Sequence, residues 1–479
     1  MGQPKMTLKQ KANAKLHSPY WQNFIIGIEI GLTGGLYVAL NMLGAAGGKP
    51  NSASTINTAN AVLCAFYALS ALFGGTVLNM IGPAWTGFFG IIGYILYIGS
   101  LWHFDKYAVA AFPLFAAICL GTSAGLIYVC QGYISMSYSE EKERGKFVAI
   151  ALNLQALGAV IGGIIPLLIN RNKNVSDGVP PAVYATFIAM DFVGCAMAFL
   201  LASPEKVRRS DGTDVAEIKP RTFLEELKGN LDALKDWRLW LMVPAFLPAQ
   251  SYLVYAGSVN VYLNSLRARS LLSFCAVVLQ IPVAWVLQWV LDHPKLKRRS
   301  RAVAGLCFVG IPLIGSWIWQ LVRDHSYNRN NPPADPVDWN DNGFAAIFVL
   351  FMLNWVFSAL WQYIVMYFLG CLTNNPRLAA NNAGVFRGIM ATGEAVTFGL
   401  DSRKVPFVLI GGLILGFYAL AFVMMGYMAL FVLEDSKYFQ EEEVTIPKHV
   451  IIEHDMQIGI DPEGLKEQGN NDSSQDEKK

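Results

Sequence analysis

Long apolar stretches dominate this sequence and decide which structures it can form. A helix needs about 20 mostly apolar residues to cross the roughly 30 Å hydrocarbon layer of a membrane. Twelve stretches satisfy that requirement: residues 20–43, 56–78, 84–102, 108–134, 147–170, 182–202, 238–264, 270–291, 302–321, 344–370, 383–400 and 405–433. We therefore predict an all-α, multi-pass integral membrane protein with twelve transmembrane helices embedded in the lipid bilayer.

The composition agrees with a membrane location. Of the 479 residues, 54% are hydrophobic and only 15% are charged, whereas a soluble domain carries about 25% charged residues. The sequence also lacks a GxxxxGK[ST] phosphate loop, an HExxH motif and a paired CxxC. We therefore expect no enzyme activity, no cofactor, no metal site and no nucleic-acid partner.

The order of the apolar stretches suggests two related halves. Six spans, a long charged linker and six further spans form the layout of transporters that are built from two repeats. The expected segments are an N-terminal segment at 1–19, the first six-helix half at 20–202, the linker at 203–237, the second six-helix half at 238–433 and an acidic tail at 434–479. We expect the tail to be solvated.

The distribution of Lys and Arg predicts the orientation, because loops rich in these residues stay on the cytosolic side. With both termini in the cytosol, the cytosolic loops, linker and N-terminal segment hold 21 basic residues and the outer loops hold 10. Asn174 then begins an Asn-Val-Ser sequon in an outer loop, where a glycan can be attached. The sequence does not distinguish the plasma membrane from an internal membrane, vacuolar or endosomal, as the location.

Three features resemble the Unc-ninety-three-like proteins, a branch of the major facilitator superfamily whose founding member is described as an ion-channel regulatory protein. They are the motifs SPYWQN (18–23) and GLTGGLY (31–37) in the first span, the motif SYSEEKERGK (137–146) before the fifth span, and the arrangement in two halves. The resemblance covers about residues 18–433 and is closest to fungal members. It implies the superfamily fold of two six-helix halves.

The superfamily places a latch between its second and third spans, with a pattern close to Gly-x-x-x-Asp-Arg-x-Gly-Arg. Here the turn glycines remain, but the acid is replaced by Asn79 and the bases are missing, whereas the matching loop of the second half keeps an acid and a basic cluster. Those bases are also explained by membrane topology alone. The gating-loop candidates are Gly75, Asn79, Gly82, Asp292, Arg298 and Arg299.

Four ionisable residues lie inside predicted spans, where each costs at least a few kcal/mol unless it faces the bundle interior or a wet cavity. Glu29 is in the first span, which the resemblance places on the central cavity. Arg387 and Glu394 are seven residues apart on the eleventh span, nearly on one face and about 10 Å apart along the axis. Arg387 is suited to an anionic or polar group and Glu394 to a proton, although both also suit a purely structural role. Asp191 is on a peripheral span and is less promising.

Uncharged polar side chains on the spans that line the cavity of the superfamily fold form a second set of candidates. Some of these side chains will only join neighbouring helices. The set is Gln131, Gln250, Asn260, Asn354 and Gln362.

Two functions of different classes fit these features. The first is a secondary transporter or facilitator that moves a small solute by alternating access, with proton coupling through Glu29 or Glu394. The second is a transporter-shaped scaffold that regulates or escorts another membrane protein, an ion channel or a receptor, and moves nothing. The resemblance and the altered loop at Asn79 favour the second function, and the charges on the cavity spans favour the first. The solute and the coupling ion stay open.

Overall fold

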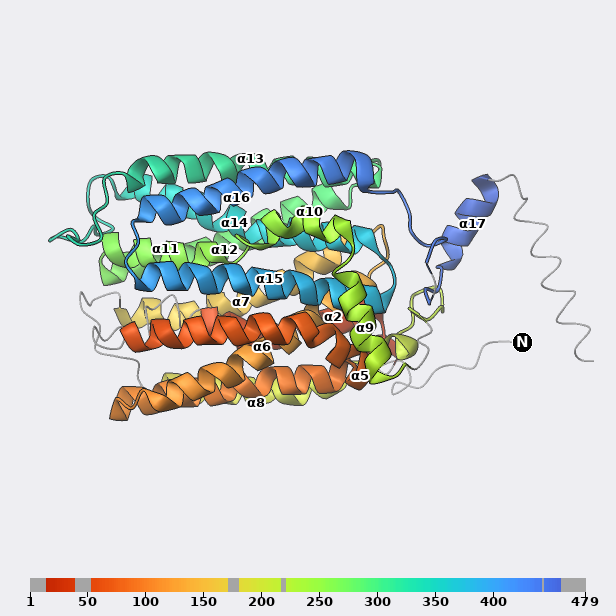
Figure 1. The fold of residues 1–479 in the computed structure, drawn as a ribbon, viewed down its shortest axis with the longest axis horizontal. Helices are drawn as coiled ribbons and strands as arrows, with labels where there is room; N and C mark the ends of the chain where they lie inside the picture. The colour runs from red at the N-terminus through yellow and green to blue at the C-terminus, as the bar shows by residue number, and fades with distance from the viewer. Residues whose placement is uncertain (1–13, 39–52, 171–180, 217–220, 442, 458–479) are drawn as a thin grey trace, which may run out of the picture.

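The computed structural model describes residues 14–38, 53–170, 181–216, 221–441 and 443–457, and its long helices lie side by side in a bundle (Figure 1). The first half of the chain forms α2 (Pro19–Ile30), the π-turn η1 (Gly31–Gly35), α5 (Ala53–Tyr107), α6 (Ala111–Ser137), α7 (Arg144–Asn170), α8 (Pro181–Met197) and the 3-10 turn η2 (Ala198–Leu200). The second half forms α10 (Trp237–Phe246), α11 (Ser251–Leu263), α12 (Leu266–Leu291), α13 (Arg298–Asp324), α14 (Phe344–Leu372), α15 (Pro376–Ser402), α16 (Phe407–Tyr427) and the π-turn η4 (Met428–Val432).

Helix α5 contains two predicted spans, the second and the third. Its backbone breaks at Gly82, which has a φ of 77°, and Pro83 follows directly. Glycine adopts a positive φ without steric cost, and proline lacks the N–H that would continue the helix. The turn predicted between the two spans therefore lies here, and Gly82 forms it.

Within the described ranges, nine helical stretches are long and apolar enough to cross a membrane. One of them is α5 with its two crossings, and another is α10 together with α11. Two further predicted spans are α2 with η1, which is described only as far as Val38, and α15, which carries Arg387, Glu394 and other polar side chains. All twelve predicted spans are largely helical where they are described, so the all-α membrane fold is confirmed.

The two halves of the chain lie on opposite sides of the bundle. Figure 1 shows α2, α5, α6, α7 and α8 on one side and α10 to α16 on the other. The halves meet where α5 and α6 pack against α15 and where α7 packs against α12. A Cβ atom on Gly75 would lie 2.5 Å from Asn381 Oδ1 and 2.9 Å from Asn381 Cα. Gly75 therefore allows α5 to approach α15 closely.

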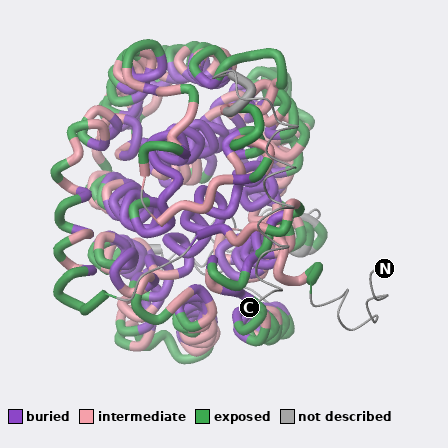
Figure 2. Tube along the Cα trace, turned by 90° about the vertical axis from the view of Figure 1, so that its right-hand side faces the viewer, coloured by how far each residue is buried: buried purple, intermediate pink, exposed green. Residues whose placement is uncertain are grey.

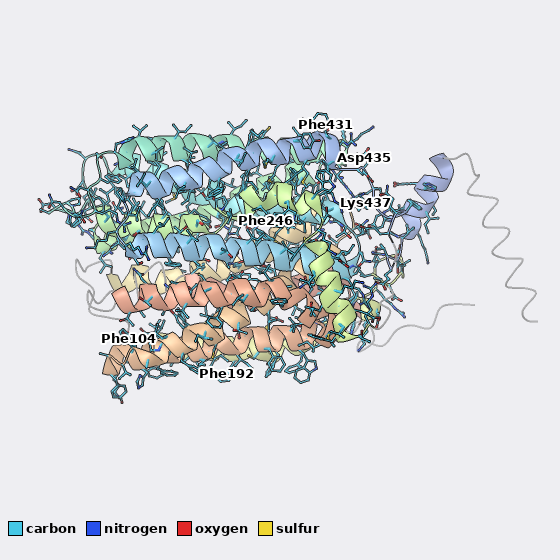
Figure 3. All side chains as sticks on the ribbon, viewed as in Figure 1. Phe104, Phe192, Phe246, Phe431, Asp435 and Lys437 are labelled. Carbon is cyan, nitrogen blue, oxygen red and sulfur yellow. The ribbon has the colours of Figure 1, made fainter. Side chains whose placement is uncertain are left out.

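Burial follows the pattern expected of a bundle surrounded by lipid. Figure 2 shows buried residues in the middle of the bundle and exposed residues on its periphery. In Figure 3, Phe192 and Phe431 lie on opposite outer sides, and both are more than half exposed, whereas Phe246 lies in the middle and is fully buried. Large apolar side chains on the outside are stable when the solvent around them is hydrocarbon.

The linker and the tail lie at the same end of the bundle (Figure 1). The linker contains α9 (Phe223–Ala233), and the tail contains α17 (Lys448–Gln457). We call this end the linker end. The long connection between α13 and α14 lies at the opposite end.

Candidate functional site

A polar cleft lies between the two halves. It is a partly open space of ≈ 480 Å³, lined from the first half mainly by α7 and from the second half by α11, α12 and α14. Four glutamines line it: Gln155 of α7, Gln250 just before α11, Gln280 of α12 and Gln362 of α14. No charged side chain is found among the described residues that line it. The cleft therefore presents amide groups rather than charges.

Aromatic side chains form part of the cleft wall. Tyr252 packs against the edge of Trp355, with the ring centroids 5.5 Å apart. Tyr363 also lines the cleft; its hydroxyl donates to Asn153 Oδ1 (2.8 Å) and accepts a longer bond from Gln280 Nε2 (3.4 Å). The cleft wall thus contains both polar groups and aromatic rings.

Arg387 lies directly behind the cleft and is 1% exposed. Its Nη1 donates to Gln362 Oε1 (3.3 Å) and its Nη2 to Gln131 Oε1 (3.0 Å). Gln362 in turn donates from Nε2 to Gln250 Oε1 (3.0 Å). Four residues singled out in the sequence, Arg387, Gln131, Gln250 and Gln362, are thus brought into one hydrogen-bonded chain that joins α6 of the first half to α14 and α15 of the second.

The guanidinium group of Arg387 has no carboxylate partner in the part of the chain that the structure describes. Its terminal nitrogens also contact the sulfurs of Met390 and Met366, each at 3.7 Å. The ring centroids of Tyr128 and Phe386 lie 4.9 and 5.0 Å from its central carbon. Polarisable sulfur and aromatic faces stabilise a cation in a dry site. Arg387 is therefore held by neutral groups.

Glu394 lies two turns further along α15 and is also buried. Its carboxyl shares a hydrogen bond with Cys64 of α5. Both Arg387 and Glu394 are on buried positions of α15, as expected from their spacing, but they do not form an ion pair with each other. Glu394 is thus a buried acid at the contact between the halves.

Glu29 and Asp191 lie away from the cleft. A Cβ atom on Gly87 of α5 would be 3.4 Å from Glu29 Oε2, which places this carboxyl inside the first half. The carboxyl oxygens of Glu29 and Asp191 have no hydrogen-bond partner among the described residues. Contrary to what the resemblance implied, Glu29 therefore does not face the cleft, because α2 turns its carboxyl toward α5 rather than toward the second half.

The two asparagine candidates also lie outside the cleft. Asn260 Nδ2 reaches the carbonyl oxygen of Arg269 and Ser273 Oγ, both at 3.5 Å, and thus links α11 to α12. Asn354 lines a separate pocket of ≈ 320 Å³ within the second half, together with Gln320 and Trp317 among others. Both residues make their contacts within the second half.

Charged groups join the halves at the linker end. Glu141, in the loop between α6 and α7, forms an ion pair with Arg298 of α13 at 2.5 Å. Asp292 of the second half accepts hydrogen bonds from the backbone N–H groups of Gly145 (2.8 Å) and Lys146 (2.6 Å) at the start of α7. A carboxylate is stabilised at a helix N-terminus by the unpaired N–H groups and the helix dipole. We call these contacts the gate.

Further gate contacts come from residues that the sequence analysis did not select. Arg144 donates to the carbonyl oxygen of Gly370 and to Asn374 Oδ1 (2.8 Å), both in the second half. Arg144 and Glu141 belong to the SYSEEKERGK motif that carried the family resemblance, so this motif was the available signal. Arg299, by contrast, is one of the predicted gating-loop residues, and it donates to the carbonyl oxygen of Leu433 (2.7 Å) within the second half, so it does not join the halves.

The acid missing at Asn79 is replaced by one from the linker. Asn79 Nδ2 donates to Glu226 Oε2 of α9 (3.0 Å), and Glu226 forms an ion pair with Arg377 of α15. Helix α9 starts with a capping box between Thr222 and Glu225, which fixes its first turn. The loop at Asn79 is therefore part of a charged contact between the halves, although the sequence there lacks the acid.

The tail packs on the gate, contrary to the expectation that it is solvated. Glu441 accepts hydrogen bonds from the backbone N–H groups of Asn374 (2.6 Å) and Asn375 (3.1 Å), and Glu443 lies 3.2 Å from Arg377. Figure 3 shows Asp435 and Lys437 of the same segment beside the end of the bundle. The acids of the tail complement the bases at the linker end. Composition alone could not reveal that the two groups are in contact. Residues 458–479 lie outside the described residues, as does the sequon at Asn174.

The comparisons with known proteins agree on the family and the fold. Residues 55–279 match the family described as ion channel regulatory protein UNC-93. An uncharacterised membrane protein of Schizosaccharomyces pombe is 32% identical over 406 residues, which cover 84% of this chain and 83% of that protein. UNC93-like protein 1 of Arabidopsis thaliana is 28% identical over 82% of this chain and 86% of its own length.

Among solved structures, the major facilitator superfamily transporter FucP, in its outward conformation, aligns with a TM-score of 0.60. The alignment covers 85% of this chain and 98% of that chain at 11% identity, so the likeness concerns the fold alone. The chain belongs to the UNC-93 family and has the fold of the major facilitator superfamily.

Proposed function

We propose that the protein is a secondary transporter or facilitator that moves a small solute by alternating access. The observation that carries the proposal is a polar cleft between two halves whose linker ends are joined by hydrogen bonds and ion pairs. Such contacts break and reform as units when the halves rock against each other around a central site. The positive-inside rule then makes the linker end cytosolic, with both termini on that side, in the plasma membrane or an internal membrane. A glycan at Asn174 would lie on the other side.

Transport requires the gate to open and close. Breaking one buried ion pair such as Glu141–Arg298 costs about 3 to 5 kcal/mol if nothing replaces it. Water that enters the opened gate hydrates the separated charges and offsets part of this cost. A charged gate thus gives two states that differ little in free energy, as alternating access needs.

Proton coupling is proposed to involve Glu394 rather than Glu29. Glu394 is buried at the contact between the halves, lies beside Cys64, and forms no ion pair with any residue that the structure describes. In proteoliposomes, an inward proton gradient should accelerate solute uptake by the wild type, and Glu394→Gln should abolish the acceleration while solute exchange continues. Glu29→Gln is the matched control and should keep the acceleration, because its carboxyl lies inside the first half. Loss of coupling in the control alone would contradict this assignment.

The second candidate function is a non-transporting scaffold that regulates or escorts another membrane protein, an ion channel or a receptor. It is favoured by the description of the matching family and by the linker and tail contacts that reinforce the gate. Purification in mild detergent would then recover a partner in a fixed ratio, and vesicles containing the pure protein would show no flux under any gradient. Saturable, protein-dependent flux would contradict the scaffold hypothesis.

A further inference from the structure

We propose that the cleft binds an uncharged solute that carries several hydroxyl or amide groups, a class to which small polyols belong. The inference names the chemistry of the site, and its biological meaning rests on the proposed transport function. It is carried by three observations: the neutral lining, the fixed direction of the amide hydrogen bonds, and the aromatic wall.

The neutral lining disfavours a charged solute. An ion that enters a dry site without an opposite charge loses several kcal/mol of hydration that nothing restores. Two ionisable side chains lie close behind the lining: Arg387, which bonds to Gln362, and Glu394, whose charge acts on Tyr252. The two terminal nitrogens of Arg387 donate to the amide oxygens of Gln362 and Gln131 and contact two sulfurs. The Nε–H of Arg387 has no hydrogen-bond partner among the described residues, but Arg387 itself does not line the cleft, so an anion in the cleft gains no direct contact with it.

The direction of the hydrogen bonds follows from Arg387, because a guanidinium group can only donate. Gln362 must turn its carbonyl oxygen to Arg387, so its NH₂ group faces Gln250 and donates to the carbonyl oxygen there. The NH₂ group of Gln250 is left as a donor without a partner in the described part of the chain. Arg387 is thus a positioning residue for a donor that it does not touch.

Two acceptors complete the polar groups. Tyr363 donates to Asn153, so it accepts the hydrogen bond from Gln280 Nε2 and leaves the carbonyl oxygen of Gln280 without a donor among the described residues. Gln155 Nε2 bonds to the hydroxyl of Tyr128 at 3.1 Å and leaves a second carbonyl oxygen unused. A solute that satisfies the cleft must therefore both donate and accept hydrogen bonds, as hydroxyl and amide groups do.

The aromatic wall adds a surface for the carbon skeleton of such a solute. Trp355 lines the cleft, is 4% exposed, and its indole N–H has no acceptor within the described ranges. Its ring is stacked on Phe351 and meets Tyr252 edge-on. The C–H face of a polyol can pack on these rings while its hydroxyl groups meet the amides.

The test uses three compounds that share a six-carbon hydroxylated chain and differ in charge: D-sorbitol, D-gluconate and N-methyl-D-glucamine. Thermal unfolding of the full chain in detergent is measured with each compound at up to about 10 mM, which is too dilute for the general stabilisation that polyols cause by exclusion from protein surfaces. A ligand that binds only the folded state raises the unfolding temperature. D-sorbitol should raise it, and the two charged compounds should not.

Variants assign the shift to the cleft. Gln250→Glu keeps an acceptor for Gln362 but removes the free donor, so it should fold and lose the sorbitol shift. The control variant Val278→Leu changes an exposed apolar position two residues before Gln280, and it should keep the rise in unfolding temperature with sorbitol. A shift with gluconate or N-methylglucamine that equals or exceeds the sorbitol shift, an unchanged shift in Gln250→Glu, or no shift with sorbitol would overturn the inference.

The outcomes separate this inference from the proposed function. A cleft-dependent sorbitol shift without any flux in vesicles would support the inference and contradict transport. Flux of charged solutes alone would support transport and contradict the inference.

Discussion

At the scale of single residues, the buried charges of this protein are stabilised in two different ways. Arg387 is surrounded by amide oxygens, sulfurs and aromatic faces, and its charge orients the amides around the cleft. Glu141 instead has two guanidinium partners, Arg298 and Arg144, at the edge of the bundle. The first arrangement holds a fixed site, and the second can separate when the halves move.

The pH dependence of stability should report the ion pair of Glu141. Burial by itself raises the pKa of this carboxyl, but Arg298 and Arg144 outweigh burial and hold the pKa below its usual value. A carboxyl with a lowered pKa in the folded state stabilises the fold above its unfolded pKa, and this contribution is lost as the pH falls through the folded pKa.

The expected result is that Glu141→Gln lowers the free energy of unfolding by about 3 kcal/mol at neutral pH. The difference from the wild type should shrink below about pH 4.5, where the unfolded carboxyl becomes protonated. Denaturant unfolding between pH 3 and 8 measures this difference in the free energy of unfolding. Glu143→Gln, at a half-exposed position in the same loop, is the control and should follow the wild type. A difference that is constant with pH would rule out the ionised carboxyl as the cause.

At the scale of helices and segments, the start of α15 collects contacts from the linker and the tail. Arg377 meets Glu226 of α9 and Glu443 of the tail, and Glu441 caps the N–H groups that precede the helix. Glu453 forms a surface pair with Lys142, where both side chains are more than half exposed. Exposed pairs contribute about 0 to 1 kcal/mol, and buried charged hydrogen bonds about 1.5 to 3 kcal/mol.

Removing the tail acids should therefore loosen the start of α15. In the double variant Glu441→Gln with Glu443→Gln, amide hydrogen exchange at residues 374–380 should become at least roughly tenfold faster, since each tenfold corresponds to about 1.4 kcal/mol. Mass spectrometry of the corresponding peptide measures this rate. Glu453→Gln should leave it unchanged. Equal exchange in the double variant and the wild type would mean that the tail does not hold this helix.

The sequence predicted the helices better than their rotation. Apolar length located the spans, and the turn glycine Gly82 marked the break inside α5, because both signals are local. The direction in which Glu29 points depends on which neighbour α2 packs against, and no local pattern encodes that. Arg387 and Gln362 were found because buried polar groups in spans are rare, whereas Glu226 and Glu441 lie in polar segments where an acid is unremarkable until the partner bases are seen.

At the scale of the whole molecule, the central claim is that the two halves move relative to each other around the cleft. The superfamily fold supplies two halves with few covalent connections, and the gate joins them by contacts that are individually reversible. A rigid scaffold with the same fold would need the gate to stay closed. Locking the gate covalently therefore separates the two functions.

The most direct measurement is solute flux in proteoliposomes with a disulfide across the gate. A Cβ atom on Gly145 would lie 2.8 Å from the Cβ of Leu291 in the other half. A disulfide needs about 3.5 to 4.5 Å between these atoms, so Gly145→Cys with Leu291→Cys can be oxidised to a bond when the backbone shifts by about 1 Å, after the seven native cysteines are replaced. The control pair, Gly87→Cys with Ala198→Cys, joins positions 3.3 Å apart within the first half. Oxidation should stop flux through the gate pair and reduction should restore it, whereas the control pair should keep its flux throughout. Undiminished flux with the gate disulfide formed would contradict the account.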